Sequence, residues 1–248
     1  MSHNILRGPS IATDNLKFAF DAASKSSYAG SGSVIHGLAS GVDAELVNTV
    51  SFVSDNRGYF NLDGLDDYIA CNKIDLSDTK VVTVGLMIKA GSSTNAQMIA
   101  EFSTNYASNT DGFFFSYQDS IFGYTKDIMM GTKGNNGRNI VAFSKSILSD
   151  QQWKYLCLVY DRSADTPIST RCKLYVNSVR QIASQAHNPN WRSDNTNNFG
   201  NNGLFVGARH GGVAPFLGSV ACCHVYKKAL STKEMYANYT AIKTRFGL

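Results

Sequence analysis

Glutamate is scarce in this chain. Of its 19 acidic residues only Glu45, Glu101 and Glu234 are glutamates, and the others are aspartates. Glutamate favours helices, whereas aspartate favours turns and helix caps, so this bias points away from a helical protein. Only 17% of the residues are charged, the net charge is +4, and the basic residues are scattered. We therefore expect no nucleic-acid partner, because such binding needs clustered Lys and Arg.

The five cysteines form neither a metal-binding pattern nor a disulfide framework. Their number is odd, no Cys-x-x-Cys pair occurs, and no histidine lies at zinc-finger spacing from a cysteine. Cys222 and Cys223 are adjacent in an apolar run, where a strand would point them to opposite faces. We expect the cysteines to be small buried hydrophobic residues that hold no cofactor.

Targeting signals are also missing. The opening sequence MSHNILRGPS lacks the apolar stretch of a signal peptide, and no segment approaches the length of a membrane span. We therefore expect synthesis in a reducing cytoplasm and no membrane partner. The hydrophobic share of 43% is enough to bury a core, which excludes a disordered chain.

Short segments rich in β-branched and aromatic residues recur along the whole chain, with turn residues between them. They cover residues 16–20, 49–53, 59–62, 67–71, 81–89, 98–102, 112–117, 121–124, 139–143, 153–160, 171–177, 204–207 and 219–226. Strands dispersed in this way predict one sandwich or barrel. The Asp63-Gly64 pair between two apolar segments predicts a β-hairpin. Residues 131–139 and 187–203, rich in Gly and Asn, are predicted loops.

One helix is expected near the C-terminus. Ser231 and Glu234 have the spacing of a capping box, in which both side chains satisfy exposed amides at a helix start. Met235, Tyr239 and Ile242 then recur at roughly helical spacing. We expect this helix to pack on the sandwich.

Several motifs occur in the order typical of one known family. They are Leu62-Asp63-Gly64-Leu65-Asp66-Asp67-Tyr68-Ile69, Thr83 to Lys89, Trp153 to Asp161, Leu174-Tyr175-Val176-Asn177, Leu204 to Gly207 with Phe216-Leu217-Gly218, and Val225 to Ser231 with Glu234 and Asn238-Tyr239. Together they resemble the laminin-G-like (LamG-like), concanavalin A-like jelly rolls, although Ser178 stands where that family has Gly. The resemblance implies an all-β antiparallel jelly-roll β-sandwich with a short C-terminal helix. Residues 16–248 would form the domain and residues 1–15 an N-terminal arm.

The two ends of the chain carry a narrower resemblance. Residues 8–16 and the segment from Asn238 to Phe246 are similar to LamG-like proteins of marine tailed-phage virions. This resemblance implies a bacteriophage structural protein, such as a capsid decoration, collar or fibre-associated component.

Glycoside hydrolysis needs two carboxylates on one face, about 5–10 Å apart. No two glutamates are close in this sequence: Glu101 stands alone, Glu234 belongs to the helix cap, and Glu45 is expected in a loop. No Gly-x-Ser-x-Gly nucleophile motif occurs. We therefore predict no catalytic residues and a protein that is not an enzyme.

Asp63, Asp66 and Asp67 form the densest acidic cluster. They are candidate calcium ligands, because calcium prefers several carboxylate oxygens. The favoured alternative is that the three aspartates support a turn through hydrogen bonds to the backbone, which needs no metal.

Three residues are candidates for carbohydrate binding: Trp191, Arg192 and Tyr124. Exposed aromatic rings stack on sugars, but tyrosines also fill the core of a sandwich, and Trp191 could equally be a buried anchor for its loop.

The sequence thus predicts a non-enzymatic virion structural protein, synthesised in the host cytoplasm, whose partners are other virion proteins or further copies of itself. The alternative is a lectin-like module that recognises a host surface glycan. A glycosidase that uses Glu101 is the weakest reading, because that reaction needs a second carboxylate.

Overall fold

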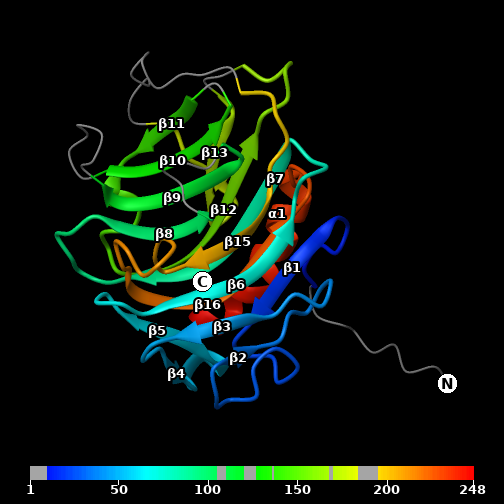
Figure 1. Ribbon diagram of the computed structural model, residues 1–248. Coiled ribbons are helices and arrows are strands. Elements are labelled where there is room, and N and C mark those ends of the chain that lie inside the picture. The colour runs from blue at the N-terminus through cyan, green and yellow to red at the C-terminus, as the bar shows by residue number, and fades with distance from the viewer. Residues whose placement is uncertain (1–9, 105–109, 120–126, 136, 168–169, 184–194) are drawn as a thin grey trace.

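The computed structural model describes residues 10–104, 110–119, 127–135, 137–167, 170–183 and 195–248. Two antiparallel eight-stranded sheets form a sandwich, and one α-helix follows the last strand (Figure 1). The elements are β1 (Leu16–Asp21), β2 (Val34–Ile35), β3 (Ala44–Val47), β4 (Ser51–Val53), β5 (Tyr59–Asp63), β6 (Tyr68–Asp75), β7 (Val81–Ala90), β8 (Gln97–Phe102), β9 (Gly112–Asp119), β10 (Asp127–Gly134), β11 (Gly137–Phe143), β12 (Trp153–Asp161), β13 (Cys172–Val176), β14 (Val179–Arg180), β15 (Asn201–Val206), β16 (Leu217–Tyr226) and α1 (Thr232–Lys243). The all-β sandwich with a C-terminal helix, predicted from the sequence, is confirmed.

Sheet A has the strand order β14-β13-β12-β7-β16-β5-β4, with β1 also paired to β16. The two partners share one edge of β16: β5 pairs with residues 217–220 and β1 with residues 222–226. Sheet B has the order β11-β10-β9-β8-β15-β6-β3-β2. In Figure 1 sheet B is stacked from β11 at the top to β2 at the bottom, and α1 lies on the far side of the sandwich.

The main core lies between the two sheets. It is built from the inward-facing residues of both, such as Phe18 and Leu86 in sheet A and Val206 in sheet B, all fully buried. Cys223 also faces this core, whereas Cys222 lies in the second cluster on the outer face of sheet A. All five cysteines are free and buried, as predicted. Burial raises their pKa values, that of Cys172 to about 12, so the thiols are inert.

The hairpin predicted at Asp63-Gly64 is wrong. β5 pairs within sheet A and β6 within sheet B, so this turn carries the chain from one sheet to the other. Gly64 has a φ of +75°, and a Cβ there would lie 2.7 Å from the Cβ of Leu217. Turn residues determine where the chain reverses, but they do not determine the partner of either strand.

The loop predicted at residues 131–139 is also wrong. β10 continues to Gly134 and β11 starts at Gly137, and the two strands pair with each other. Gly131 lies opposite Phe114 of β9, where a Cβ would come within 2.3 Å of a ring carbon. Glycine therefore makes room for an aromatic ring on the neighbouring strand instead of forming a turn.

Helix α1 covers the outer face of sheet A. Its buried residues are Met235, Asn238 and Ile242, of which the two apolar ones pack on a cluster that includes Met87 and Tyr155. The helix begins with the predicted capping box, in which Ser231 and Glu234 each bind the backbone of the other. No described helix is long and apolar enough to span a membrane.

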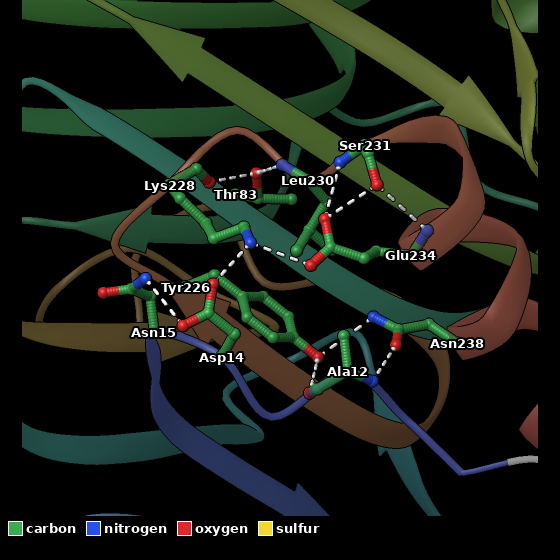
Figure 2. Close-up of polar contacts among 10 residues, drawn as sticks. All are labelled: Ala12, Asp14, Asn15, Thr83, Tyr226, Lys228, Leu230, Ser231, Glu234 and Asn238. Carbon is green, nitrogen blue, oxygen red and sulfur yellow. Dashed lines mark hydrogen bonds and ion pairs between the residues drawn. The ribbon is translucent and has the colours of Figure 1, made fainter.

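The N-terminal segment is joined to α1 through three residues, Ala12, Tyr226 and Asn238, which we call the terminal latch (Figure 2). The Ala12 amide donates to Asn238 Oδ1 at 2.7 Å, and Asn238 Nδ2 donates to the Tyr226 hydroxyl at 3.0 Å. That hydroxyl donates to the Ala12 carbonyl at 3.0 Å. Residues 10–15, predicted as part of an N-terminal arm, thus lie against the domain, and residues 1–9 lie outside the described part of the chain.

A charged group reinforces the latch. Lys228 Nζ lies 2.7 Å from Asp14 Oδ2 and 2.8 Å from Glu234 Oε1. The hydrogen bond from Lys228, followed by that from the Ser231 amide, lowers the pKa of Glu234 to about 2. Glu234 therefore serves both the helix cap and the contact with the N-terminal segment.

Candidate functional site

A row of outward-facing side chains crosses most of sheet B. Glu45 of β3 lies opposite Ala70 of β6, Ala70 opposite Phe205 of β15, and Phe205 opposite Glu101 of β8. The row continues to Phe114 of β9. Because the neighbours of each residue along its strand lie in the main core, these five side chains point to the outer face.

A cavity of about 570 Å³ opens on this face over β3, β6 and β15, and we call it the sheet B cavity. Its lining combines aliphatic and aromatic carbon with carboxylate, amide, hydroxyl, ammonium and imidazole groups. It is lined by Val34, Asp43, Ala44, Glu45, Ala70, Cys71, Asn72, Lys73, Ser103, Thr104, Gly203, Phe205 and His210. The expectation that Glu45 lies in a loop is wrong, since it is an exposed residue of β3; that strand has only four residues, too few to be recognised from its sequence.

Aromatic rings gather at one wall of the sheet B cavity. The ring of Phe205 is half-buried and meets the His210 ring edge-to-face, with centroids 5.2 Å apart. Tyr68, on the neighbouring strand β6, lies 6.3 Å from Phe205 on the same face. Gly203, which also lines the cavity, has no side chain, and a Cβ there would lie 3.2 Å from the Phe205 ring. The small residue leaves the ring accessible from the cavity.

Glu101 lies beneath this wall and is fully buried. Both of its oxygens accept from the Arg209 guanidinium, each at 3.2 Å, and Ser103 Oγ donates to Oε1 at 2.9 Å. The His210 amide donates to Oε2 at 3.2 Å. The carboxylate thus fastens the loop after β15 to the face of the sheet and places the His210 ring at the cavity.

Glu45 and Glu101 do not have the spacing of a hydrolytic pair. They lie in one row but are three strands apart, which corresponds to roughly 14 Å at the usual distance between strands. Two-carboxylate hydrolysis works over roughly 5–10 Å. Glu101 is moreover held by Arg209 and closed off from solvent.

Residues 63–235 match the family model of the concanavalin A-like lectin/glucanases superfamily (Laminin_G_3), which is more than half of the chain. The chain belongs to the concanavalin A-like superfamily. No curated protein matches the sequence of this superfamily member.

Several solved structures have a similar fold. The receptor-binding domain of botulinum neurotoxin D is similar with a TM-score of 0.63 and 12% identity, over 91% of this chain and 52% of that one. Trypanosoma rangeli sialidase is similar with a TM-score of 0.63 and 12% identity, over 95% of this chain and 34% of that one. Domain 4 of AbnA, an arabinanase from Geobacillus stearothermophilus, gives a TM-score of 0.59 and 12% identity, over 91% and 98%. The concanavalin A-like chain thus spans about half of the neurotoxin domain, and at these identities the likeness is one of fold.

The three aspartates predicted as calcium ligands are brought together in this concanavalin A-like chain. Their carboxylate oxygens lie within 4.8 Å of one another. Asp67 is buried, and its oxygens accept from the Thr49 amide at 2.8 Å and from the Asp63 amide at 3.2 Å. Asp63 accepts from the Leu65 amide at 2.8 Å, and Asp66 is exposed. The turn alternative accounts for the positions of Asp63 and Asp67, and calcium binding stays a prediction.

The candidates for sugar contact, Trp191, Arg192 and Tyr124, lie outside the described residues. The sheet B cavity contains other groups that could hold a sugar, which sequence reasoning missed. Phe205 lies in a strand predicted from the sequence, but the sequence alone does not show which face of the sheet its ring occupies. The signals available in the sequence were Glu101, a lone acid in an apolar strand, and Arg209, a lone base after a strand.

Proposed function

We propose that this chain is a glycan-binding module and that a saccharide lies in the sheet B cavity. The observation that carries the proposal is the combination of the half-buried Phe205 ring with hydrogen-bonding groups around it. Pyranose rings offer an apolar face for an aromatic ring and a rim of hydroxyls for side chains such as Asn72, Thr104 and Glu45.

The comparisons support a binding role. The ligand-binding domain of botulinum neurotoxin serotype D is described in complex with N-acetylneuraminic acid, and Domain 4 of AbnA in complex with arabinotriose. Both have the fold of this chain. A non-enzymatic role fits the cavity, because Glu101 is engaged by Arg209 and Glu45 is distant from it.

The test is a glycan array followed by calorimetric titration of the best ligand with the wild type and Phe205→Ala. We expect the substitution to weaken binding about tenfold, equivalent to about 1.4 kcal/mol. Ile182→Ala is the matched control, because Ile182 is 91% exposed after β14 of sheet A and its loss leaves the cavity intact.

A second variant guards against misfolding of Phe205→Ala. Ala70→Leu adds a side chain to the cavity wall at the centre of the row, and we expect it to block binding while thermal unfolding stays cooperative. Unchanged affinity in both variants, or no glycan bound by the wild type, would contradict the proposal.

We further propose that the module serves in a tailed-phage virion. What supports this role is the narrow resemblance of the two ends of the chain, and these ends form one unit through the latch contact between Ala12 and Asn238. In such a particle the domain would be anchored to other virion proteins and present the sheet B cavity outward. Mass spectrometry of purified particles tests this role, and absence of the chain from them would refute it.

A further inference from the structure

A second cavity adjoins the sheet B cavity. Its volume is about 310 Å³, and we call it the lysine pocket because three of its eight lining residues are lysines from three strand regions. It is lined by Lys17, Ser40, Val42, Lys73, Ile74, Asp75, Asn201 and Lys227. Lys73 of β6 lines both cavities, so the two lie next to each other along its side chain.

The lysine pocket draws on both sheets. Lys17 comes from β1 and Lys227 follows β16, both in sheet A, while Lys73 and Asp75 belong to β6 of sheet B. The pocket therefore lies between the edges of the two sheets, next to the sheet B cavity. A chain of sugars could continue from one to the other past Lys73.

Two acidic residues offset part of this positive charge. Lys227 forms an ion pair with Asp78, an exposed residue beside the pocket. Asp75 accepts from the amide and the hydroxyl of Ser77, at 3.0 and 2.6 Å, and these bonds, aided by attraction to Lys227 and Lys17, lower its pKa. It therefore stays ionised at neutral pH.

The remaining lysines leave the pocket positive. Among the described residues, neither Lys17 nor Lys73 has a carboxylate within ion-pair distance. Three ammonium groups thus face two carboxylates, of which one lies outside the lining. An anion that entered would therefore meet a pocket in which the ammonium groups exceed the carboxylates by one charge.

We propose that the lysine pocket binds an anionic substituent, a carboxylate or a sulfate, of the saccharide whose neutral rings occupy the sheet B cavity. This inference rests on the proposed function of that cavity. Ammonium groups recognise anions through charge-assisted hydrogen bonds, and a partly enclosed pocket screens them less than open solvent does. Asn201 and Ser40 would supply further polar contacts to the same substituent.

The test compares matched oligosaccharides on one array: neutral, carboxylated and sulfated forms of the same backbone. The proteins are the wild type, Lys73→Met and Lys17→Met. We expect the wild type to prefer at least one charged form over the neutral one by about tenfold, and each variant to lose that preference, as removal of one charge-assisted contact implies. The carboxylated and sulfated arms show which anion the pocket takes.

Lys145→Met is the matched control for net charge. Lys145 follows β11, at the edge of sheet B opposite to β2, and its removal lowers the charge by the same amount. A loss of preference in Lys145→Met equal to that in Lys73→Met would overturn the inference, because it would show attraction by the whole protein. So would a single-stranded DNA oligomer of equal charge that binds as tightly as the saccharide.

Failure of the inference differs from failure of the proposed function. Equal binding of neutral and charged forms, weakened by Phe205→Ala, would leave the sheet B cavity as a glycan site and refute the lysine pocket. Absence of binding to every saccharide would refute both. Each lysine variant is also checked by thermal unfolding, where we expect the wild-type midpoint within about two degrees, since surface substitutions usually change stability by less than about 0.5 kcal/mol.

Discussion

The outer face of sheet A is covered, whereas part of the outer face of sheet B is open. On sheet A, helix α1 and residues 10–16 cover an apolar cluster that includes Tyr155, Cys157 and Cys222. On sheet B, the part built from β3, β6 and β15 opens into the sheet B cavity. Both sheets follow the same two-residue alternation, so the fold itself does not decide which face can bind. The position of one helix does.

Polar groups hold segments against both faces, but they are exposed to solvent to different degrees. Beneath α1 the terminal latch joins uncharged groups, Tyr226 and Asn238, with the Ala12 backbone. On sheet B the buried group is the ion pair of Glu101 and Arg209, whose arginine remains 27% exposed. The covered face of sheet A also has an ion pair, in which Arg245, only 6% exposed, lies 2.8 Å from Asp21 of β1. The pair of Glu101 and Arg209, which we call the tether, differs in that its arginine is partly solvated beside the cavity.

The covering of sheet A is tested most strongly by Met235→Ala. Met235 is 2% exposed and packs in the cluster under α1, so we expect a loss of about 3 kcal/mol in the free energy of unfolding. Tyr236→Ala is the control, because Tyr236 is 56% exposed on the same helix and should change stability by less than about 0.5 kcal/mol. Urea denaturation measures both, and equal losses would show that the helix does not cover the sheet as described.

The tether on sheet B is tested by Glu101→Gln. We expect a loss of about 2 kcal/mol, less than for a fully buried ion pair because Arg209 is partly solvated. A double-mutant cycle with Arg209→Met measures the coupling by urea denaturation. Additive losses would contradict a direct role of the pair in holding the loop. Glu101→Gln should also lower glycan affinity, because the His210 amide loses its contact with the carboxylate.

Acid should weaken the sheet A side first. Burial, the largest cause, lowers the pKa of His224 on β16 to about 4, against 6.5 when the chain is unfolded. The unfolded chain therefore binds a proton that the folded chain does not, and stability falls as the pH drops from about 6.5 to 4, by about 2.5 kcal/mol at pH 4.5. Midpoints of thermal unfolding across this range should lose most of their slope in His224→Gln. An unchanged slope would contradict the assignment.

Glu234 affects stability over a lower pH range than His224. Its folded pKa of about 2 lies below its usual value of 4.5, so its contribution is complete above pH 4.5 and is lost as the pH falls toward 2. Comparison of the wild type with Glu234→Gln should therefore show a difference that shrinks in this range, separate from that of His224.

The latch itself should contribute less than the packing around it. Tyr226→Phe removes the hydroxyl that donates to Ala12 and accepts from Asn238, and we expect a loss of about 1.5 kcal/mol. Tyr239→Phe, a half-buried position on α1, is the matched control and should be close to neutral. Hydrogen exchange of the Ala12 amide provides a local readout of its bond to Asn238, and equal stability of Tyr226→Phe and Tyr239→Phe would contradict the latch.

We expect the smallest effect at the turn between β5 and β6, where calcium is added and the unfolding midpoint is measured. If hydrogen bonds alone position Asp63 and Asp67, 5 mM calcium should leave the unfolding midpoint unchanged, in the wild type as in Asp66→Asn. A calcium-dependent rise that Asp66→Asn removes would instead establish the calcium site predicted from the sequence.

Alternation and caps made the strands and the helix predictable from the sequence. A strand with one buried face has a period of two, and the capping box of Ser231 and Glu234 satisfies amides within one turn. These signals are local. The short strand that carries Glu45 has too few residues to show a period, so it was missed.

The site depends on contacts between distant parts of the sequence. Arg209 and Glu101 are 108 residues apart, and nothing in either segment names the other. The same limit explains the error at Asp63-Gly64, where the turn was evident but the partners of β5 and β6 were not. Phe205 could be assigned to the outer face only once its neighbours Leu204 and Val206 were known to face the core.

The pairing of β1 with β16 has a consequence for how the protein is made. Leu16 lies opposite Tyr226, so β1 cannot pair with β16 until almost the whole chain has been synthesised. At roughly 5–20 residues per second on the ribosome, that wait lasts on the order of 10–40 s. During this time the backbone amide and carbonyl groups at the edge of β1 are unpaired and can bind neighbouring nascent chains. Slower initiation or a lower growth temperature should thus raise the yield of folded protein more than a change to any single side chain in the latch.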